Sequence, residues 1–162
     1  MNNRRKKWGL IFVILLAGLL ATFYLSTPKA TSHTIEANGI TGAVTNQRDA
    51  QICFDLLEKN LTAASNKDIE TYIDTLVSSA HEETAQEMTT FFDTYTLAHT
   101  LLSFEIVKQE ASSMLVAAQQ QTINLGENSY RNHITQAHHT FVKEGAAWKI
   151  QQTVMTNTSF ID

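Results

Sequence analysis

Residues 140–150 read Thr-Phe-Val-Lys-Glu-Gly-Ala-Ala-Trp-Lys-Ile. Apolar and polar residues alternate on both sides of a turn that contains Gly145, and such alternation is typical of β-strands. Glycine readily takes the positive φ that tight hairpin turns need. We therefore predict a β-hairpin whose closing strand presents Trp148 and Ile150 on its buried face. A loop of two or four residues puts Phe141 opposite Trp148, whereas a loop of three residues reverses the faces.

Two more strands are predicted before this hairpin, because the period of the apolar residues changes from 3.6 toward 2 after about His99. They run over about 102–107 and 114–125, with Leu102, Phe104 and Ile106 on one face of the first. A Gly-Glu-Asn turn follows the second strand, and the hairpin's own first strand begins near residue 130. The four strands form an antiparallel meander.

Three helices are predicted between residues 49 and 95, because apolar residues recur there at the i, i+3, i+4 spacing of a helical face. Ser65 or Asn66 can cap the second helix, and Ser79-x-x-Glu82 resembles a capping box for the third. The expected inner faces are Ile52, Cys53, Leu56, Leu57, Leu61 and Ala64, then Ile69, Tyr72, Ile73, Leu76 and Val77, then Ala85, Met88, Phe92 and Tyr95. Helices followed by a meander predict an α+β fold, with three helices packed on one face of a curved antiparallel sheet.

This order of elements, together with the 140–150 hairpin, resembles the nuclear transport factor 2-like superfamily, which includes the polyketide-cyclase-like (SnoaL-like) proteins. The resemblance covers roughly residues 49–157. It implies a cone-shaped, cystatin-like roll with an internal cavity, which different members use for catalysis, ligand binding or protein contact. It also implies a homodimer, since members often pair through the sheet. The superfamily's ketosteroid isomerase uses aspartates in its site, and this chain has none from Leu101 to Ser159.

Histidines are the natural candidates for chemistry, because His133, His138 and His139 fall on one predicted strand. His133 and His139 share a face, and His138 points to the other. The residues that are candidates for lining the cavity are Asp93, Tyr95, His133 and His139. The strand histidines are also explained as half-exposed residues whose ring nitrogens have ordinary hydrogen-bond partners. No spacing matches a catalytic motif, a metal site or a cofactor loop, so we expect no catalytic residues, no metal and no cofactor.

The N-terminal segment begins with Arg4-Arg5-Lys6-Lys7 and continues with an apolar run over 8–25. Eighteen uncharged residues cover roughly 27 Å as a helix, close to the thickness of a bilayer core. A cleaved secretory signal is the rival interpretation, but no small-residue cleavage site follows the run. The basic flank predicts a cytoplasmic N-terminus and a single-pass anchor in the cell membrane. We divide the chain into a basic stretch and anchor (1–25), a flexible tether (26–48) and an extracytoplasmic domain (49–162).

The charge of the exported part argues against nucleic acid as a partner. Five of the 12 basic residues lie within the first 30 positions, so seven remain against all 16 acidic residues, a formal charge of −9. One cysteine cannot form an internal disulfide. We therefore expect a non-catalytic interaction or assembly module of a bacterial cell envelope with a protein partner, such as a scaffold subunit of a secretion or conjugation complex. The alternative is a small-molecule binder or a lyase or isomerase that uses the fold's cavity.

Overall fold

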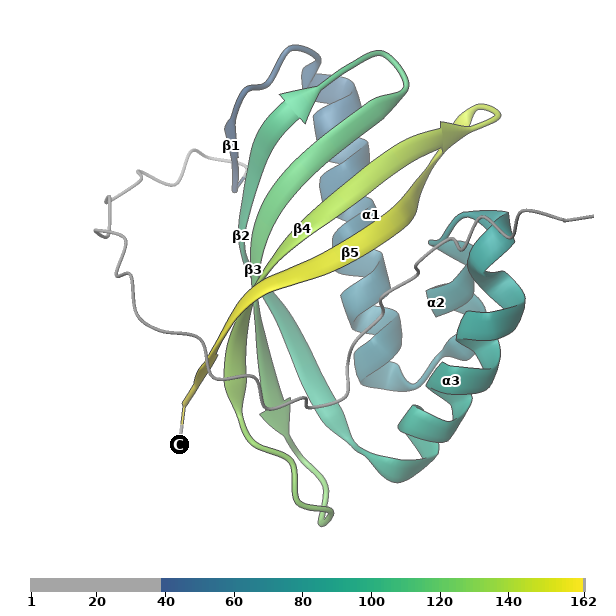
Figure 1. Ribbon diagram of the computed structural model, residues 1–162, viewed down its shortest axis with the longest axis vertical. Coiled ribbons are helices and arrows are strands. Elements are labelled where there is room, and N and C mark those ends of the chain that lie inside the picture. The colour runs from purple at the N-terminus through teal and green to yellow at the C-terminus, as the bar shows by residue number, and fades with distance from the viewer. Residues whose placement is uncertain (1–38, 162) are drawn as a thin grey trace, which may run out of the picture.

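The computed structural model describes residues 39–161. Its elements follow in the order β1 (Ile40–Gly42), α1 (Gln47–Asn66), α2 (Ile69–Asp74), the 3₁₀ turn η1 (Ser78–Ala80), α3 (His81–Thr94), β2 (Leu97–Gln109), β3 (Ser113–Asn124), β4 (His133–Glu144) and β5 (Ala147–Phe160). This order confirms the α+β class with three helices before the long strands. The helices lie on one face of a strongly twisted sheet (Figure 1).

The sheet has five strands in sequence order, and it is mixed rather than wholly antiparallel. β2 to β5 form the expected antiparallel meander, while β1 pairs in parallel with β2, Ile40 opposite Phe104. The strand β1 lies within the range 26–48, where we predicted a flexible tether, so the folded part already includes Ile40, ahead of the start predicted near Asp49. Three residues are too few to show an alternating pattern, and their partner is about sixty positions away in the sequence.

The core lies between α1 and the sheet. Ala50, Cys53, Leu57 and Leu61 line the inner face of α1, as the helical spacing predicts, although Ile52 is 40% exposed. They share one buried cluster with the inward side chains of the strands, Phe104, Ile106, Met114, Val116, Phe141, Trp148 and Ile150. Burial raises the pKa of the Cys53 thiol to about 12, so this cysteine behaves as a small apolar residue.

The helix caps differ from those predicted. Asn46 caps α1 by accepting from the Asp49 N–H, and Asp68, rather than Ser65 or Asn66, caps α2. The capping box at Ser79 is absent, because α3 begins with no side-chain cap. A 3₁₀ turn precedes it instead, and the Ser78 N–H and hydroxyl both donate to the Glu144 carboxylate.

The hairpin between β4 and β5 has a two-residue loop, and Gly145 takes a φ of +64° at its first position. Type II′ turns need glycine at that place. The pairing puts Phe141 opposite Ile150 and Lys143 opposite Trp148, so the partner of Phe141 lies two residues beyond the predicted one. The face is nevertheless correct, because an even loop preserves the alternation and leaves Phe141, Trp148 and Ile150 all buried.

The strand β2 contains two register shifts, between Leu101 and Ser103 and between Ile106 and Lys108. The extra residues at these shifts, Leu102 and Val107, are 42% and 47% exposed. Leu102 therefore does not share the buried face with Phe104 and Ile106. A bulge locally reverses which side chains face the core. A sequence pattern with a strict period of two does not reveal such a reversal.

The predicted anchor over 8–25, its orientation and most of the tether lie outside the described residues. Within 39–161, none of the helices has the length and apolar character needed to cross a bilayer.

Candidate functional site

His139 lies fully inside the fold, on the face of β4 that the helices cover, and is 2% exposed. Its Nε2 is 2.7 Å from the Gln120 Nε2, and its Nδ1 is 3.0 Å from the Thr153 hydroxyl. A neutral ring with its proton on Nδ1 satisfies both contacts, since it accepts from the amide and donates to the hydroxyl. Burial lowers the pKa of His139 to about 4, so the ring is uncharged at neutral pH.

His99 forms a second interior contact, on β2. Its Nδ1 is 3.1 Å from the Thr122 hydroxyl, and its backbone N–H donates to the Ser65 hydroxyl at the end of α1. Burial is the larger cause that lowers the pKa of His99 to about 4, and the nearby His133 adds to the shift. Sequence reasoning placed His99 before the strand predicted over 102–107 and missed this role, because β2 begins five residues earlier than predicted.

Tyr95 and His133 belong to an aromatic cluster where the end of α3 meets the start of β4. Tyr95 follows α3, and its ring packs on Phe91 and Tyr130 with centroids 5.1 Å away from each. The His133 ring contacts Tyr130 and Phe160, and its Nδ1 is 2.9 Å from the Arg131 carbonyl. These rings pack chiefly on one another.

The four predicted cavity residues therefore do not form one site. His133 and His139 share the inner face, as predicted, but His139 is bound to Gln120 and Thr153, whereas His133 joins the aromatic cluster. Asp93 is exposed on α3 and makes no hydrogen bond or ion pair within the described residues. A His and Asp pair of the kind that general acid–base chemistry uses is not assembled here.

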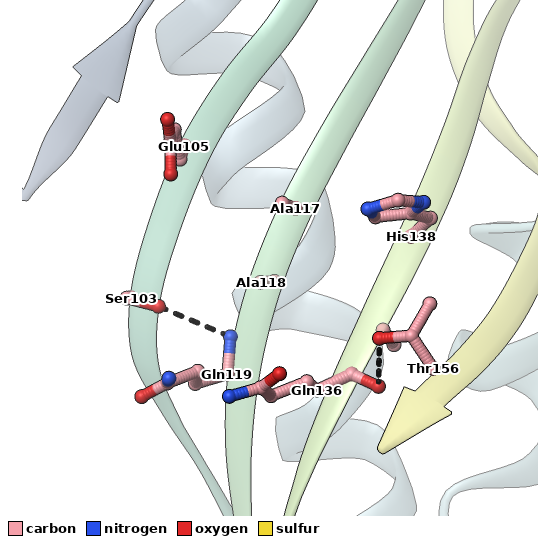
Figure 2. Close-up of a pocket in the computed structure, with 9 residues that line it drawn as sticks. Ser103, Glu105, Ala117, Ala118, Gln119, Gln136, His138 and Thr156 are labelled. Carbon is pink, nitrogen blue, oxygen red and sulfur yellow. Dashed lines mark hydrogen bonds between the residues drawn. The ribbon is translucent and has the colours of Figure 1, made fainter. Parts of the chain in front are cut away.

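A hollow of about 240 Å³ lies on the opposite, outer face of the sheet. Ala117 forms its floor, with Glu105 on one neighbouring strand and His138 on the other, because both pair with Ala117 in the register. Figure 2 shows these two side chains on either side of the small residue. The remaining lining residues are Ser103, Ala118, Gln119, Gln136, Ala137 and Thr156.

This hollow offers polar groups that the protein leaves available. The Ser103 hydroxyl accepts from the Gln119 N–H, and the Thr156 hydroxyl donates to the Gln136 carbonyl. The Glu105 carboxylate, the His138 ring and the two glutamine amides make no hydrogen bond or ion pair within 39–161. The sequence signal for it was two alanines followed by three glutamines over residues 117–121. Its location could not be deduced without the register of three strands.

Metal binding has no donor set in this part of the chain. Among residues 39–161, no three His, Cys, Asp or Glu side chains are grouped closely enough to hold an ion.

Solved structures share this fold at low sequence identity. A proposed aromatic ring hydroxylase from Novosphingobium aromaticivorans aligns with a TM-score of 0.64 at 16% identity, over 73% of this chain and 96% of that one. A protein of unknown function with a cystatin-like fold from Nostoc punctiforme gives 0.59 at 15% identity, over 68% and 91%. A nuclear transport factor 2-like protein from Novosphingobium aromaticivorans gives 0.54 at 12%, over 72% and 84%. Among curated proteins, none matches this chain significantly.

Three helices on one face of this twisted sheet, with structural neighbours of this kind, define a nuclear transport factor 2-like, or cystatin-like, fold. The predicted resemblance is thereby confirmed. Within that fold, a family model matches residues 55–161, which is more than half of the chain. The chain belongs to the family of the C-terminal domain of the anti-sigma-I factor RsgI9.

Proposed function

We propose that this chain is a membrane-anchored regulator of the anti-sigma-factor kind, and that its folded domain is a non-catalytic sensing or interaction module outside the cytoplasm. The match to the RsgI9 C-terminal domain over residues 55–161 carries this proposal. The basic N-terminus followed by an apolar run supports the topology. RsgI9 is named as an anti-sigma-I factor, so a sigma-I factor is the proposed partner in the cytoplasm, and the domain acts on it across the membrane.

The outer-face hollow supports a binding role for the domain. Glu105 and His138 flank an alanine floor, and the amides of Gln119 and Gln136 are available beside them. Carboxylate, imidazole and amide groups together suit a polar partner that both donates and accepts hydrogen bonds. The interior supports a catalytic role less well, because both ring nitrogens of His139 are already engaged.

A scaffold role in a secretion or conjugation complex draws less support. The matched family is named for the control of a sigma factor, not for the assembly of an envelope machine.

The test compares the two faces of the sheet in cells that carry a reporter for sigma-I-dependent transcription. Glu105→Gln with His138→Gln removes the charged and titratable groups of the hollow, and Glu58→Gln on the exposed face of α1 is the matched control. We expect the hollow pair to change reporter output several-fold at unchanged protein level, and the control to behave as the native chain.

Two outcomes contradict the proposal. A reporter that does not respond to deletion of the whole chain removes the regulatory role. A folded, anchored His133→Gln and His139→Gln double variant that behaves like the deletion, while the hollow pair is silent, moves the site to the interior.

A further inference from the structure

β5 forms one edge of the sheet, and only the beginning of that edge is covered. Leu76 pairs in parallel with Ile150. There the Ile150 N–H donates to the Thr75 carbonyl at 2.9 Å, and the Val77 N–H donates to the Ile150 carbonyl at 3.0 Å. Beyond this point, residues 151–160 make no backbone hydrogen bond across the edge within the described chain. Ten residues, about 33 Å of strand, are left open.

The backbone N–H and C=O groups that face the open edge belong to alternate residues of β5. Side chains and backbone hydrogen-bonding groups alternate together along a strand, and Ile150 combines an inward side chain with an outward-bonding backbone. The later residues that pair with the inward side of β4 therefore point their N–H and C=O groups to the open edge. They are Thr153, Met155, Thr158 and Phe160, which lie opposite His139, Ala137, Thr135 and His133.

This edge lacks two of the features that usually prevent pairing. From Gln151 to Phe160 there is no charged residue and no proline, and these are the common means by which edge strands avoid one another. Val154, Met155 and Phe160 are 42%, 40% and 53% exposed, which places three large apolar side chains along the open stretch. Two irregularities lie within it, because the register of β5 against β4 skips Gln151 at its start and Thr156 near its middle.

We propose that the open edge of β5 pairs antiparallel with the same edge of a second copy of this chain. The four open residues are spaced symmetrically about a point between Thr156 and Asn157, so each meets an open residue of the partner, Met155 against Thr158 and Thr153 against Phe160. The irregular residue Thr156 falls at the twofold axis in both copies. No like charges oppose each other, and the contact closes on itself, as twofold interfaces do.

This pairing would join two five-stranded sheets into one ten-stranded sheet. It would leave the outer-face hollow of each copy accessible, because it uses the sheet's edge and not its face. The proposal goes beyond the proposed function and does not depend on it.

The pairing is tested by disulfide cross-linking of variants of the full chain that carry one added cysteine, in native membranes with a mild oxidant. In an antiparallel pair, only residues near the axis lie opposite their own copies, within the roughly 7 Å that a disulfide can bridge. We expect Thr156→Cys and Asn157→Cys to give dimers. Gln152→Cys should not, because its two copies lie about nine residues, or roughly 30 Å, apart. Cys53 is fully buried, so the native chain is the blank.

A second variant checks that the dimer depends on the edge. Met155→Lys, added to Asn157→Cys, should remove most of the cross-linked dimer, whereas Ile52→Lys on α1, which is equally exposed, should leave it unchanged.

Three results overturn the proposal. Dimers from Ala117→Cys alone would show pairing through the outer face. Equal cross-linking at Ile52→Cys and Asn157→Cys would show random collision. Absence of dimers at Thr156 and Asn157, with a folded protein, would show that the edge stays unpaired or binds another polypeptide.

Discussion

His139 illustrates how the fold accommodates an imidazole without ionising it. Its two ring nitrogens are matched by one donor, the Gln120 amide, and one acceptor, the Thr153 hydroxyl. A protonated ring would present two N–H groups and lose its acceptor role toward the amide. Together with burial, which disfavours the charged form, this explains why the ring stays neutral.

The two interior histidines should make the domain sensitive to acid. Their pKa values are about 4 in the folded state and about 6.5 in the unfolded chain. Above pH 6.5 both states are neutral, so stability is at its full value. As the pH falls from about 6.5 to 4, only the unfolded chain takes up protons, and each ring should cost up to about 3 kcal/mol of unfolding free energy.

Urea unfolding of a fragment over residues 39–162 between pH 7.5 and 4.5 measures this effect. His139→Gln should lower the starting stability and reduce the pH slope. A native profile that is flat over this range would contradict the assignment of neutral buried rings.

At the scale of elements, Asp49 holds the final hairpin against α1. Its carboxylate accepts from the Trp148 Nε1 and pairs with the Lys143 ammonium, each at 3.1 Å. These contacts, with the Trp148 hydrogen bond first, hold the pKa of Asp49 below its usual value. Trp148 itself is 4% exposed, so the hairpin is fixed by both packing and a hydrogen bond.

Trp148→Ala should therefore destabilise the domain by about 3 to 5 kcal/mol, because it removes a buried aromatic ring. That is a large part of the roughly 5 to 15 kcal/mol expected for a whole domain. Trp148→Phe retains most of the ring but loses the donor to Asp49, and we expect it to cost about 1 to 3 kcal/mol. Thermal unfolding followed by circular dichroism distinguishes the two, and a melting temperature unchanged in Trp148→Ala would refute the buried placement.

Local pattern predicts these elements well where it is periodic and uninterrupted. The apolar spacing of Cys53, Leu57 and Leu61 predicted the buried face of α1, and the alternation after Gly145 predicted that Trp148 and Ile150 are buried. Prediction failed where a distant partner decides the outcome. β1 depends on pairing with β2, and a 3₁₀ turn whose Ser78 bonds to Glu144 replaces the capping box predicted at Ser79.

The candidate site divides in the same way. Alternation placed His133 and His139 on one face, which the structure confirms, but it could not show that Gln120 and Thr153 occupy the ring nitrogens of His139. The outer hollow depends on the alignment of Glu105, Ala117 and His138 across three strands. That alignment follows from register, to which bulges contribute, and a sequence contains no direct record of it.

At the scale of the whole molecule, the predicted topology is a basic end in the cytoplasm and a domain outside. Protease added to intact spheroplasts should then remove residues 39–162 while leaving a short membrane-bound fragment. The same treatment of a cytoplasmic marker is the control. A full-length chain that stays protected would contradict the orientation, and a domain found free in the medium would contradict the anchor.

The strand β1 also determines where mechanical load enters the domain. Any pull transmitted through the residues before Gly39 reaches Ile40 first, and β1 is held to β2 by only three residue pairs, with the Ala43 N–H bonded to the Ile106 carbonyl just beyond them. The other strand pairs are much longer. Under tension, the short parallel strand should detach first and leave the four-stranded meander and its helices folded.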